Sequence, residues 1–488
     1  MRQTDWLEFW AGITPDKTAI IEGDNQWSYQ TLNDYTYKTV NLLVKHQISK
    51  GDRIVIIAEF TIEYLFLFGA AMKSGIILVP LNYRLTPSEI NKLVEDVQPS
   101  LILYQEEYAP KPKGDISFEI NSFFQNINER SSTTRESRHL SMDDDVFILY
   151  TSGSSGKPKG VKYTYKMMYW NAVNTQVSLG INSDSKTIIC MPPFHTGGWN
   201  VLLTPLLHCG GTSILKKSFD AAEIFDDIKK YHITIFMGVP TMLRMMTEDV
   251  RFNQAHWPSL RYIIVGGEAM PKSLIKTYHD KGVLVRQGFG MTEAGPNLTS
   301  LHDKYAIEKI GSIGRPNMYV DISIVDENDR EVADGEQGEL RISGPIVLKG
   351  YYSKPEMTKK SFKDGWFYTG DIVIRDEDGF LYIVDRIKNM YISGGENVYP
   401  AEVERTILNH EKVSEAIVIG VSDSKWGEVG KALIIPKKGS TIELSELQEY
   451  CKKTLSKFKI PKHLELISEF PKNDTGKIDR KSVRNKYG

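Results

Sequence analysis

Three consecutive segments between residues 53 and 81 constrain the fold more than any other feature of this sequence. RIVIIAE (53–59) is rich in β-branched residues, TIEYLFLFGAAMKSG (61–75) has the composition of a helix, and IILVPL (76–81) is apolar again. A strand, a helix and a second strand joined by short connections form a βαβ unit with parallel strands. The stretch is interrupted by Lys73 and Gly75, so it is too short to span a bilayer.

Similar apolar runs recur along the first two thirds of the chain. They lie at 100–104, 146–150, 186–191, 233–239 and 261–267. A further helix is predicted to open with a capping pattern of Thr86, Pro87 and Glu89. Several runs end directly in Gly or Pro, so loops leave the strands at their carboxyl ends, where α/β sheets bind ligands. The predicted fold class is α/β, with parallel-rich sheets in a large N-terminal domain of several subdomains.

The sequence changes character near residue 386. A short helix beginning at Pro400 is predicted to bury Val403, Ile407 and Leu408. Two strands (416–421 and 431–436), an amphipathic helix (444–457) and a last strand (463–468) follow. About a hundred residues of this kind form a small α+β domain. We predict an N-terminal domain over 1–386 and a small mobile C-terminal domain over 387–488, with the boundary at residues 386–390.

Length and composition limit the kinds of partner. A chain of 488 residues requires more than one domain. Its 60 Lys and Arg nearly balance its 62 Asp and Glu, which argues against nucleic acid or an anionic membrane as a partner. Three widely spaced cysteines suggest neither a disulfide framework nor a zinc site. The N-terminus has no apolar signal-peptide core, so we expect a cytoplasmic protein without a transmembrane segment.

The stretch YTSGSSGKPKG (150–160) has the composition of a phosphate-binding loop. Its glycines allow close backbone approach to a ligand, and its hydroxyl, amide and ammonium groups donate toward an anion. The common phosphate loop is nevertheless absent, because Lys157 is followed by Pro158 and Lys159 by Gly160. A solvated linker is the alternative interpretation, and the loop alone does not decide between them.

Five further stretches have the character of site loops. They are MPPFHTGGW (191–199), VGGEAMP (265–271), QGFGMTEAGP (287–296), YTGD (368–371) followed by the pair Asp385 and Arg386, and PKNDTGKIDR (471–480). Each alone is better explained by a structural role. Their joint order is specific.

In this order the stretches resemble the adenylate-forming, AMP-binding superfamily of acyl-CoA synthetases, adenylation domains and luciferases. The resemblance extends to GEL (338–340), GYY (350–352) and WGE (426–428), and covers nearly the whole chain. It implies an ATP-dependent acyl-CoA ligase. A carboxylic acid and ATP give an acyl adenylate and pyrophosphate, and CoA then displaces AMP.

The resemblance also implies the nucleotide site, residue by residue. The departing pyrophosphate is cradled by Thr151, Ser152, Gly153, Ser154, Ser155, Gly156 and Lys159. Adenine is bounded by Gly267, Glu268, Ala269, Gln287, Gly288 and Phe289, with Gly290 and Met291 beside them. Glu293 holds Mg²⁺, which prefers few carboxylates plus phosphate oxygens. Thr292 contacts the α-phosphate, and Lys477 bridges it to the substrate carboxylate. Asp371 accepts the ribose hydroxyls, with Arg386 and Ile383 nearby.

The acyl pocket and the CoA step are implied in the same way. His195 lies at the pocket mouth and belongs to the catalytic set with Thr292, Glu293 and Lys477, and an apolar wall suits a hydrophobic fatty or aryl acid. The wall candidates are Trp199, Met237, Gly238 and Gly295, although plain core packing is an equal alternative for Trp199 and Met237. Lys388 is the predicted hinge of the C-terminal domain, and Gly394 and Gly395 admit the pantetheine arm of CoA.

Several functions remain open on the sequence alone. One alternative is an o-succinylbenzoate–CoA ligase of menaquinone synthesis, and another is an adenylation protein that loads a separate carrier protein. An ATP sensor without turnover is disfavoured by Glu293, Asp371, Arg386 and Lys477. A luciferase-like oxygenase has no specific support. The acid and the oligomeric state are not fixed by the sequence, with a homodimer among the alternatives.

Overall fold

A computed structural model describes residues 4–108, 116–129, 139–151, 158–268, 270–472 and 478–488. The chain divides into two compact units, Met1–Ile322 with Ile342–Phe367, and Ser323–Arg341 with Tyr368–Gly488. The divisions fall inside strands β16 (Asp321–Val325), β17 (Gln337–Ser343) and β19 (Trp366–Arg375). The predicted domain boundary at residues 386–390 stays a prediction.

The first unit contains a six-stranded sheet that includes the predicted βαβ unit. The strands lie in the order β6 (Ser117–Glu119), β5 (Leu101–Tyr104), β3 (Arg53–Ile57), β4 (Ile77–Pro80), β7 (Asp145–Thr151), β8 (Lys159–Thr164). All neighbours are parallel except β7 and β8, which form an antiparallel pair. The predicted α/β fold class with parallel-rich sheets is confirmed.

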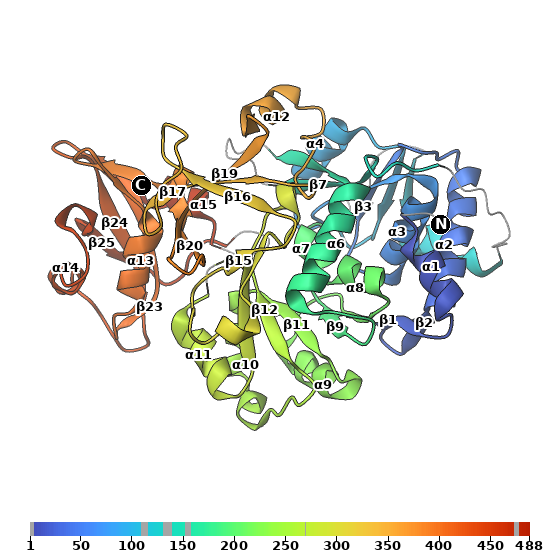
Figure 1. The fold of residues 1–488 in the computed structure, drawn as a ribbon, viewed down its shortest axis with the longest axis horizontal. Helices are drawn as coiled ribbons and strands as arrows, with labels where there is room; N and C mark the ends of the chain where they lie inside the picture. The colour runs from blue at the N-terminus through green and yellow to red at the C-terminus, as the bar shows by residue number, and fades with distance from the viewer. Residues whose placement is uncertain (1–3, 109–115, 130–138, 152–157, 269, 473–477) are drawn as a thin grey trace. The chain divides into compact units, whose positions relative to one another are not determined.

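Helix α3 (Ile62–Ser74) connects β3 to β4 and is almost entirely buried because it is apolar on all sides. It ends at Gly75, whose φ of +74° is the left-handed conformation that glycine adopts most easily. A Cβ on Gly69 would lie 2.0 Å from Thr36 Cγ2 of α2 (Tyr29–Lys45), so glycine is required for the two helices to touch. Figure 1 shows α1 (Trp6–Ile13), α2 and α3 grouped beside β3.

Lys73 is the charged residue in the last turn of this helix, and it is buried with a partner. Its ammonium lies 2.8 Å from Asp5 Oδ2, and the side chains are 1% and 0% exposed. Asp5 also caps α1 by accepting a hydrogen bond from the Glu8 amide at 3.0 Å. The ion pair therefore joins the start of α1 to the end of α3.

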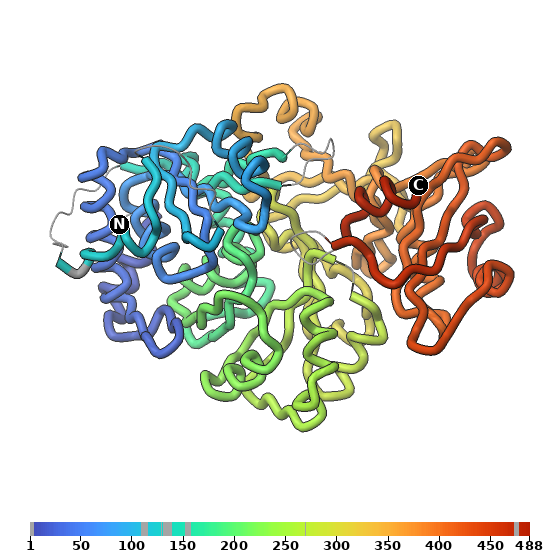
Figure 2. Tube along the Cα trace, turned by 180° about the vertical axis from the view of Figure 1, so that it is seen from behind, coloured from blue at the N-terminus to red at the C-terminus, as the bar shows by residue number. Residues whose placement is uncertain are grey.

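Two further sheets complete the first unit. One has the order β2 (Asn25–Ser28), β1 (Thr18–Glu22), β10 (Thr212–Leu215), β9 (Lys186–Ile189). The other has the order β11 (Ile235–Gly238), β12 (Tyr262–Val265), β13 (Leu284–Phe289), β14 (Thr299–Ser300), β15 (Arg315–Pro316). Strands β11, β12 and β13 are parallel to one another. Figure 2 shows this green to yellow segment as a lobe beside the blue and cyan segment.

The remaining helices of the first unit flank these sheets. They are α4 (Pro87–Val97), α5 (Ile120–Phe124), α6 (Tyr165–Leu179), α7 (Thr196–Asn200), α8 (Leu203–Cys209), α9 (Ala221–Tyr231), α10 (Pro240–Glu248), α11 (Lys272–Asp280) and α12 (Pro355–Ser361). Helix α4 opens with the predicted capping box, in which Thr86 and Glu89 exchange side-chain to backbone hydrogen bonds.

The second unit is a smaller α+β body. It contains the pairing of β19 with β20 (Leu381–Arg386) and a sheet in the order β22 (Glu396–Val398), β21 (Tyr391–Ser393), β24 (Gly427–Pro436), β23 (Val413–Asp423), with β25 (His463–Leu466) beside β24. Alternate residues of β23 face opposite sides. Val418 packs with α13 (Pro400–Leu408) and α14 (Leu444–Cys451), whereas Ile417 and Ile419 pack with Val483 of α15 (Arg480–Tyr487).

Two details of this unit differ from the sequence prediction. Val403 and Ile407 are buried as predicted, but Leu408 is 38% exposed. Adjacent helical residues point about 100° apart, so Leu408 leaves the face that Ile407 presents to β23. The predicted helix over 444–457 ends at Cys451, although Leu455 still packs against the core.

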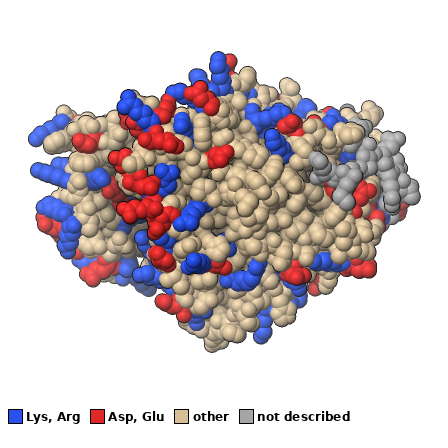
Figure 3. Space-filling view, in the orientation of Figure 1, with Lys and Arg blue, Asp and Glu red and all other residues tan. Residues whose placement is uncertain are grey.

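The visible surface carries charges of both signs, and the cysteines form no disulfide in the described residues. In Figure 3 acidic and basic side chains are interspersed over the visible face. Within the described residues, none of the helices has the length and hydropathy needed to cross a membrane. Cys190, Cys209 and Cys451 are free thiols.

Candidate active site

The predicted adenine segments lie at the carboxyl edge of the third sheet. Gly238, Val265 and Gln287 pair in one row across β11, β12 and β13. Gly267 and Glu268 follow β12, and Gly288 and Phe289 complete β13. The structure therefore places these segments at one edge, as expected for parallel strands. Ala269 lies outside the described residues.

The chain folds back tightly after this edge. A Cβ on Gly290 would lie 2.1 Å from the Pro296 carbonyl oxygen, and one on Gly288 would lie 3.0 Å from that of Thr299. Met291 then precedes the short 3-10 turn Thr292–Ala294. Glycine at position 290 therefore lets the following loop return to the strand and fixes where Glu293 lies.

The predicted phosphate stretch connects two antiparallel strands. Thr151 at the end of β7 pairs with Lys159 at the start of β8. Lys159 and Gly160 are thus strand residues, because they pair with β7, and not loop residues as the composition suggests. Gly160 accepts a hydrogen bond from the Tyr352 amide at 2.8 Å. Ser152, Gly153, Ser154, Ser155 and Gly156 lie outside the described residues.

Lys159, Glu293 and Tyr351 form a compact cluster in which Lys159 is half-buried and the other two are buried. Lys159 Nζ lies 2.6 Å from Glu293 Oε1 and donates to the Tyr351 hydroxyl oxygen at 2.6 Å. That hydroxyl in turn donates to Glu293 Oε1 at 3.1 Å. Glu293 and Tyr351 are 5% and 4% exposed. Burial and the neighbouring carboxylate raise the pKa of Tyr351, so the phenol stays protonated and can donate.

Tyr351 is a site residue that sequence reasoning did not assign. Its motif, GYY, contributed to the family resemblance, but no role followed from it. Tyr351 is 58 positions from Glu293 in the sequence, and only folding brings the two side chains together. The sequence signal that could have identified this residue is its side chain, which combines an aromatic ring with a hydroxyl. The hydroxyl contacts Lys159 and Glu293, and the ring lies 4.3 Å from the Lys159 ammonium.

The residues present fit the implied Mg²⁺. No group of three His, Cys, Asp or Glu side chains suited to a metal occurs within the described ranges. A divalent ion here would therefore have Glu293 as a single carboxylate ligand, with phosphate oxygens and water completing its shell, as Mg²⁺ prefers. The Lys159 ammonium already shows that this carboxylate binds a cation.

The predicted acyl segment surrounds helix α7. His195 immediately precedes the helix and packs edge-on against Phe194, with ring centroids 4.6 Å apart. A Cβ on Gly197 would lie 3.8 and 3.9 Å from the terminal methyl carbons of Met191 and Met237. Two flexible apolar side chains thus lie beside Gly197, two residues after His195, which suits a hydrophobic ligand.

Trp199 has the packing role that the sequence left open. It is completely buried, and its indole donates to the Pro193 carbonyl at 2.8 Å. Four rings surround it, those of Phe60, Tyr64, Phe68 and Phe147. Gly238 adjoins Phe236 and Leu243, and Gly295 adjoins Asn171. A place for these residues in the pocket wall stays a prediction.

A buried asparagine network holds the acyl and metal segments together. Asn171 of α6 donates to the Asn200 carbonyl at 2.6 Å. Asn297, which follows the Glu293 turn, donates to Thr175 of α6 at 2.5 Å. Asn317 donates to the Asn297 carbonyl at 2.7 Å. Because each partner is buried, these bonds fix α6, α7 and the segment after Glu293 against one another.

The second unit contains the carboxylate and the guanidinium that were predicted for the ribose. Arg386 Nε donates to Asp371 Oδ1 at 2.9 Å, and the two residues are paired between β19 and β20. Asp371 is buried, whereas the Arg386 side chain is 49% exposed. Glu339 accepts from the Gly370 amide at 3.0 Å, and burial together with Asp371 raises its pKa. Ile383 lies on β20 opposite Val373.

The predicted hinge and glycine segment are also in the second unit. Lys388 lies in the 3-10 turn Ile387–Asn389. Buried Asp385 accepts from the Asn389 side chain at 2.8 Å and from the Ala401 amide at 2.7 Å, which joins this turn to the start of α13.

Gly394 and Gly395 form the turn between β21 and β22. Their φ angles of +62° and +86° are left-handed, as a two-residue hairpin turn requires. A Cβ on Gly394 would lie 2.7 Å from Trp426 Cε3, and its amide donates to the Trp426 carbonyl. Lys477, the predicted catalytic lysine, lies outside the described residues.

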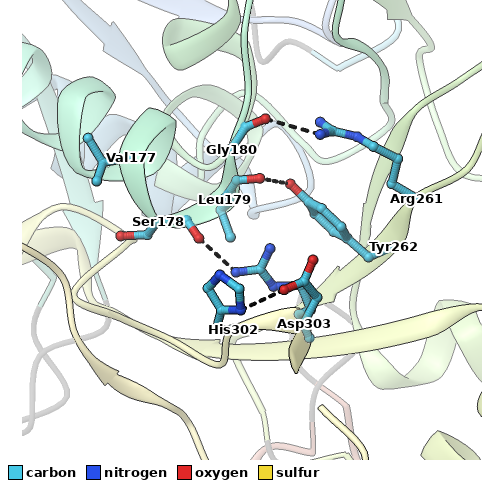
Figure 4. A pocket seen from close by; sticks show the side chains of 9 residues that line it. Val177, Ser178, Leu179, Gly180, Arg261, Tyr262, His302 and Asp303 are labelled. Carbon is cyan, nitrogen blue, oxygen red and sulfur yellow. Dashed lines mark hydrogen bonds and ion pairs between the residues drawn. The ribbon is translucent and has the colours of Figure 1, made fainter. Parts of the chain in front are cut away.

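A cavity of about 180 Å³ at the end of α6 is separate from these residues. As Figure 4 shows, its polar groups face the last turn of the helix, where Arg261 donates to the Gly180 carbonyl and Tyr262 to that of Leu179. Arg286 donates to the Ser178 carbonyl at 2.7 Å. Cations and donors at a helix C-terminus satisfy its unpaired carbonyls. We therefore assign this cavity a structural role.

Comparison with known sequences decides the family. The AMP-binding enzyme model matches residues 7–352, and the AMP-binding enzyme C-terminal domain model matches residues 402–477. The chain belongs to the AMP-binding enzyme family. The predicted family is thereby confirmed.

Relatives of this AMP-binding enzyme match over its full length. It is 34% identical over 478 residues to feruloyl-CoA synthase of an Amycolatopsis species, covering 98% of this chain and 97% of the relative. It is 35% identical over 480 residues to 2-succinylbenzoate–CoA ligase of Bacillus licheniformis, covering 98% and 99%.

Solved structures show the same architecture for this AMP-binding enzyme. O-succinylbenzoate CoA synthetase (MenE) from Bacillus subtilis, in complex with the acyl-adenylate intermediate OSB-AMP, superposes with a TM-score of 0.90 at 31% identity, covering 98% of each chain. The same synthetase in complex with ATP and magnesium ion gives 0.89 at 31% identity, covering 98% and 99%.

Proposed function

We propose that this protein is an AMP-forming acyl-CoA ligase for a hydrophobic aryl or fatty acid. The observation that carries the proposal is the cluster of Lys159, Glu293 and Tyr351, in which Lys159 belongs to the predicted phosphate stretch. The predicted enzyme class is confirmed by relatives along the whole chain. ATP, Mg²⁺ and CoA are the small molecules of this class.

The reaction has two steps with different demands on the chain. A carboxylate oxygen of the acid attacks the α-phosphorus of ATP, the bond to pyrophosphate breaks, and an acyl adenylate forms. The CoA thiolate then attacks the acyl carbon and AMP departs. Both steps bring anions together, so the site must supply donors and cations at fixed positions.

The assigned roles follow from the chemistry of each group. In this proposal Lys159 and Thr151 bind departing phosphate oxygens, and Thr292 and Lys477 stabilise charge on the α-phosphate. Mg²⁺ held by Glu293 would offset the negative charge of the triphosphate. Asp371, oriented by Arg386, is the acceptor for a ribose diol. His195 orients the acid at the pocket mouth.

The apolar side chains beside Gly197 in helix α7 support a hydrophobic acid. Met191 and Met237 offer adaptable apolar surface next to α7. The relatives named feruloyl-CoA synthase and 2-succinylbenzoate–CoA ligase favour an aryl acid. The likeness to o-succinylbenzoate CoA synthetase makes o-succinylbenzoate a specific second candidate.

A panel of acids tests the proposal. Ferulate, 2-succinylbenzoate, benzoate and fatty acids of increasing length are assayed for pyrophosphate release, with and without CoA. We expect at least one aryl or fatty acid to support pyrophosphate release and CoA-dependent AMP release. The Glu293→Gln variant should release pyrophosphate about 100-fold more slowly. Pyrophosphate release without any CoA-dependent AMP release would instead favour a carrier-protein acceptor.

The proposal includes a cytoplasmic location and free CoA as the acceptor. The protein has three free cysteines, two of them buried. Free thiols suit a reducing compartment that also holds ATP and CoA. A homodimer is tested by sedimentation velocity, in which a single species of 55.5 kDa would contradict it.

A further inference from the structure

The carboxylate assigned to Mg²⁺ already has a cation bound to it. The Lys159 ammonium lies 2.6 Å from Glu293 Oε1. The Glu293 side chain is 6% exposed and the Lys159 side chain is 19% exposed. A buried carboxylate without a counter-ion is strongly unfavourable, so Lys159 stabilises the folded protein before any ligand binds. A metal ion that approaches the same oxygen meets this ammonium.

Two cations on one buried oxygen repel each other strongly. The repulsion is large because few water molecules screen charges at this depth. Mg²⁺ can therefore use Glu293 fully only when Lys159 moves away. Lys159 stands at the first position of β8 and belongs to the predicted pyrophosphate cradle, so nucleotide phosphates offer it an alternative anionic partner.

Tyr351 can keep Glu293 in place during such an exchange. Its hydroxyl accepts from Lys159 and donates to Glu293, so it contacts both groups. When Lys159 leaves, the bond from Tyr351 to Glu293 Oε1 remains. A carboxylate accepts several bonds, so this bond leaves room for a metal ion. Tyr351 thus acts as a positioning residue for Glu293.

We propose that Lys159 is the resident counter-cation of Glu293, which Mg²⁺ replaces only when nucleotide phosphates attract Lys159. Metal and nucleotide then bind synergistically, each raising the affinity for the other. This inference rests on the proposed function, because it uses the assigned phosphate and metal positions. It adds that the site excludes metal in the absence of nucleotide.

Binding of Mn²⁺, followed by the electron paramagnetic resonance signal of the free ion, tests the exchange. Affinity is measured with and without α,β-methylene-ATP, and no acid or CoA is present. In the wild type we expect the nucleotide analogue to tighten Mn²⁺ binding about tenfold or more. In Lys159→Met we expect Mn²⁺ alone to bind about tenfold more tightly than to wild type. The further gain from the analogue should be smaller than in wild type, because only the metal ligation by its phosphate oxygens remains.

Four other variants make the outcome specific. Lys159→Arg keeps the charge, so Mn²⁺ alone should bind as weakly as to wild type. Lys162→Met changes another lysine of β8, whose ammonium lies 3.2 Å from Asp145 of β7, and should change nothing. Glu293→Gln should abolish the nucleotide-dependent Mn²⁺ site. Tyr351→Phe should weaken Mn²⁺ binding severalfold in the presence of the analogue.

The contrary results are equally clear. Equal Mn²⁺ affinity of wild type and Lys159→Met without nucleotide, or a nucleotide-dependent site that survives Glu293→Gln, overturns the exchange. Lys159→Gln is a second neutral variant should Lys159→Met fail to fold. Because the measurement uses no acid, it is independent of the acid panel. Failure of the exchange leaves pyrophosphate release intact, and failure of the panel leaves metal binding measurable.

Discussion

The buried ion pair between Lys73 and Asp5 shows how much one residue can contribute to the stability of the first unit. Replacing Lys73 by Met leaves Asp5 with an uncompensated buried charge. We expect Lys73→Met to lower the free energy of unfolding by about 3–5 kcal/mol. Calorimetry of the thermal transition of the first unit measures the loss.

A surface pair provides the matched control for this substitution. Lys50 lies 2.6 Å from Asp144, but its side chain is 37% exposed. Lys50→Met should therefore cost less than about 1 kcal/mol. The double variant Lys73→Met with Asp5→Asn should recover part of the loss, because asparagine still caps α1. Equal losses at the two lysines would rule out a special role for the buried pair.

Individual residues could be predicted where local chemistry decides them. Thr86 and Glu89 form the capping box because both partners lie within one helical turn. Lys73, by contrast, is in the sequence only a charge that interrupts an apolar stretch. Its partner Asp5 is 68 positions away, so the ion pair could not be predicted. The role of Tyr351 was missed for the same reason. The site roles of Thr292, Glu293 and His195 came from family resemblance and stay predictions.

At the scale of elements, His208 lies where α1, α6 and α8 meet. Its ring packs against Trp6 and Tyr169, and Gln176 Nε2 lies 2.5 Å from its Nδ1. Burial lowers the pKa of His208 to about 4. The unfolded chain therefore binds a proton in the range from about pH 6.5 to about 4 that the folded chain does not bind.

Stability should accordingly fall as the pH is lowered through that range. The neutral ring contributes fully above about pH 6.5, and the loss approaches about 3 kcal/mol near pH 4. We expect His208→Gln to flatten the fall of the melting temperature between these values. The same change at exposed His256 should leave the wild-type profile. Parallel profiles for His208→Gln and wild type would refute the role of burial.

The sequence predicts whether a segment is a helix or a strand better than it predicts where the segment ends and which strands pair. The βαβ unit over 53–81 formed as expected, because an apolar helix between two apolar strands has few other ways to be buried. The strand order β6-β5-β3-β4-β7-β8 could not be derived, since it depends on contacts between distant segments. The assignment of Lys159 to a strand also depends on pairing with β7.

At the scale of the whole molecule, the predicted hinge at Lys388 would let the C-terminal domain rotate between the two half-reactions. In the proposed mechanism Lys477 reaches the α-phosphate in the first step, whereas the thiol needs open access in the second, so one rigid arrangement would not serve both. Lys388→Pro fixes φ at the hinge and should restrict rotation. We expect pyrophosphate release to persist while thioester formation falls at least tenfold.

Single-turnover assays of each half-reaction measure this difference. Lys388→Ala is the control, because it removes the same side chain and leaves the backbone free to rotate. Both half-reactions should then proceed at rates close to wild type. If Lys388→Pro also supports both at wild-type rates, residue 388 is not the hinge.

The contact of Trp426 with Gly394 gives the second unit an optical reporter. Trp426 is the sole tryptophan in residues 323–341 and 368–488, and it is 39% exposed. The ammonium groups of Lys425 and Lys462 lie 5.2 and 5.6 Å from its ring. The wavelength and intensity of indole emission depend on hydration and nearby charge. Displacement of the Gly394 turn should therefore change both for Trp426. The difference spectrum between wild type and Trp426→Phe therefore isolates the fluorescence of a single position and follows that turn in real time.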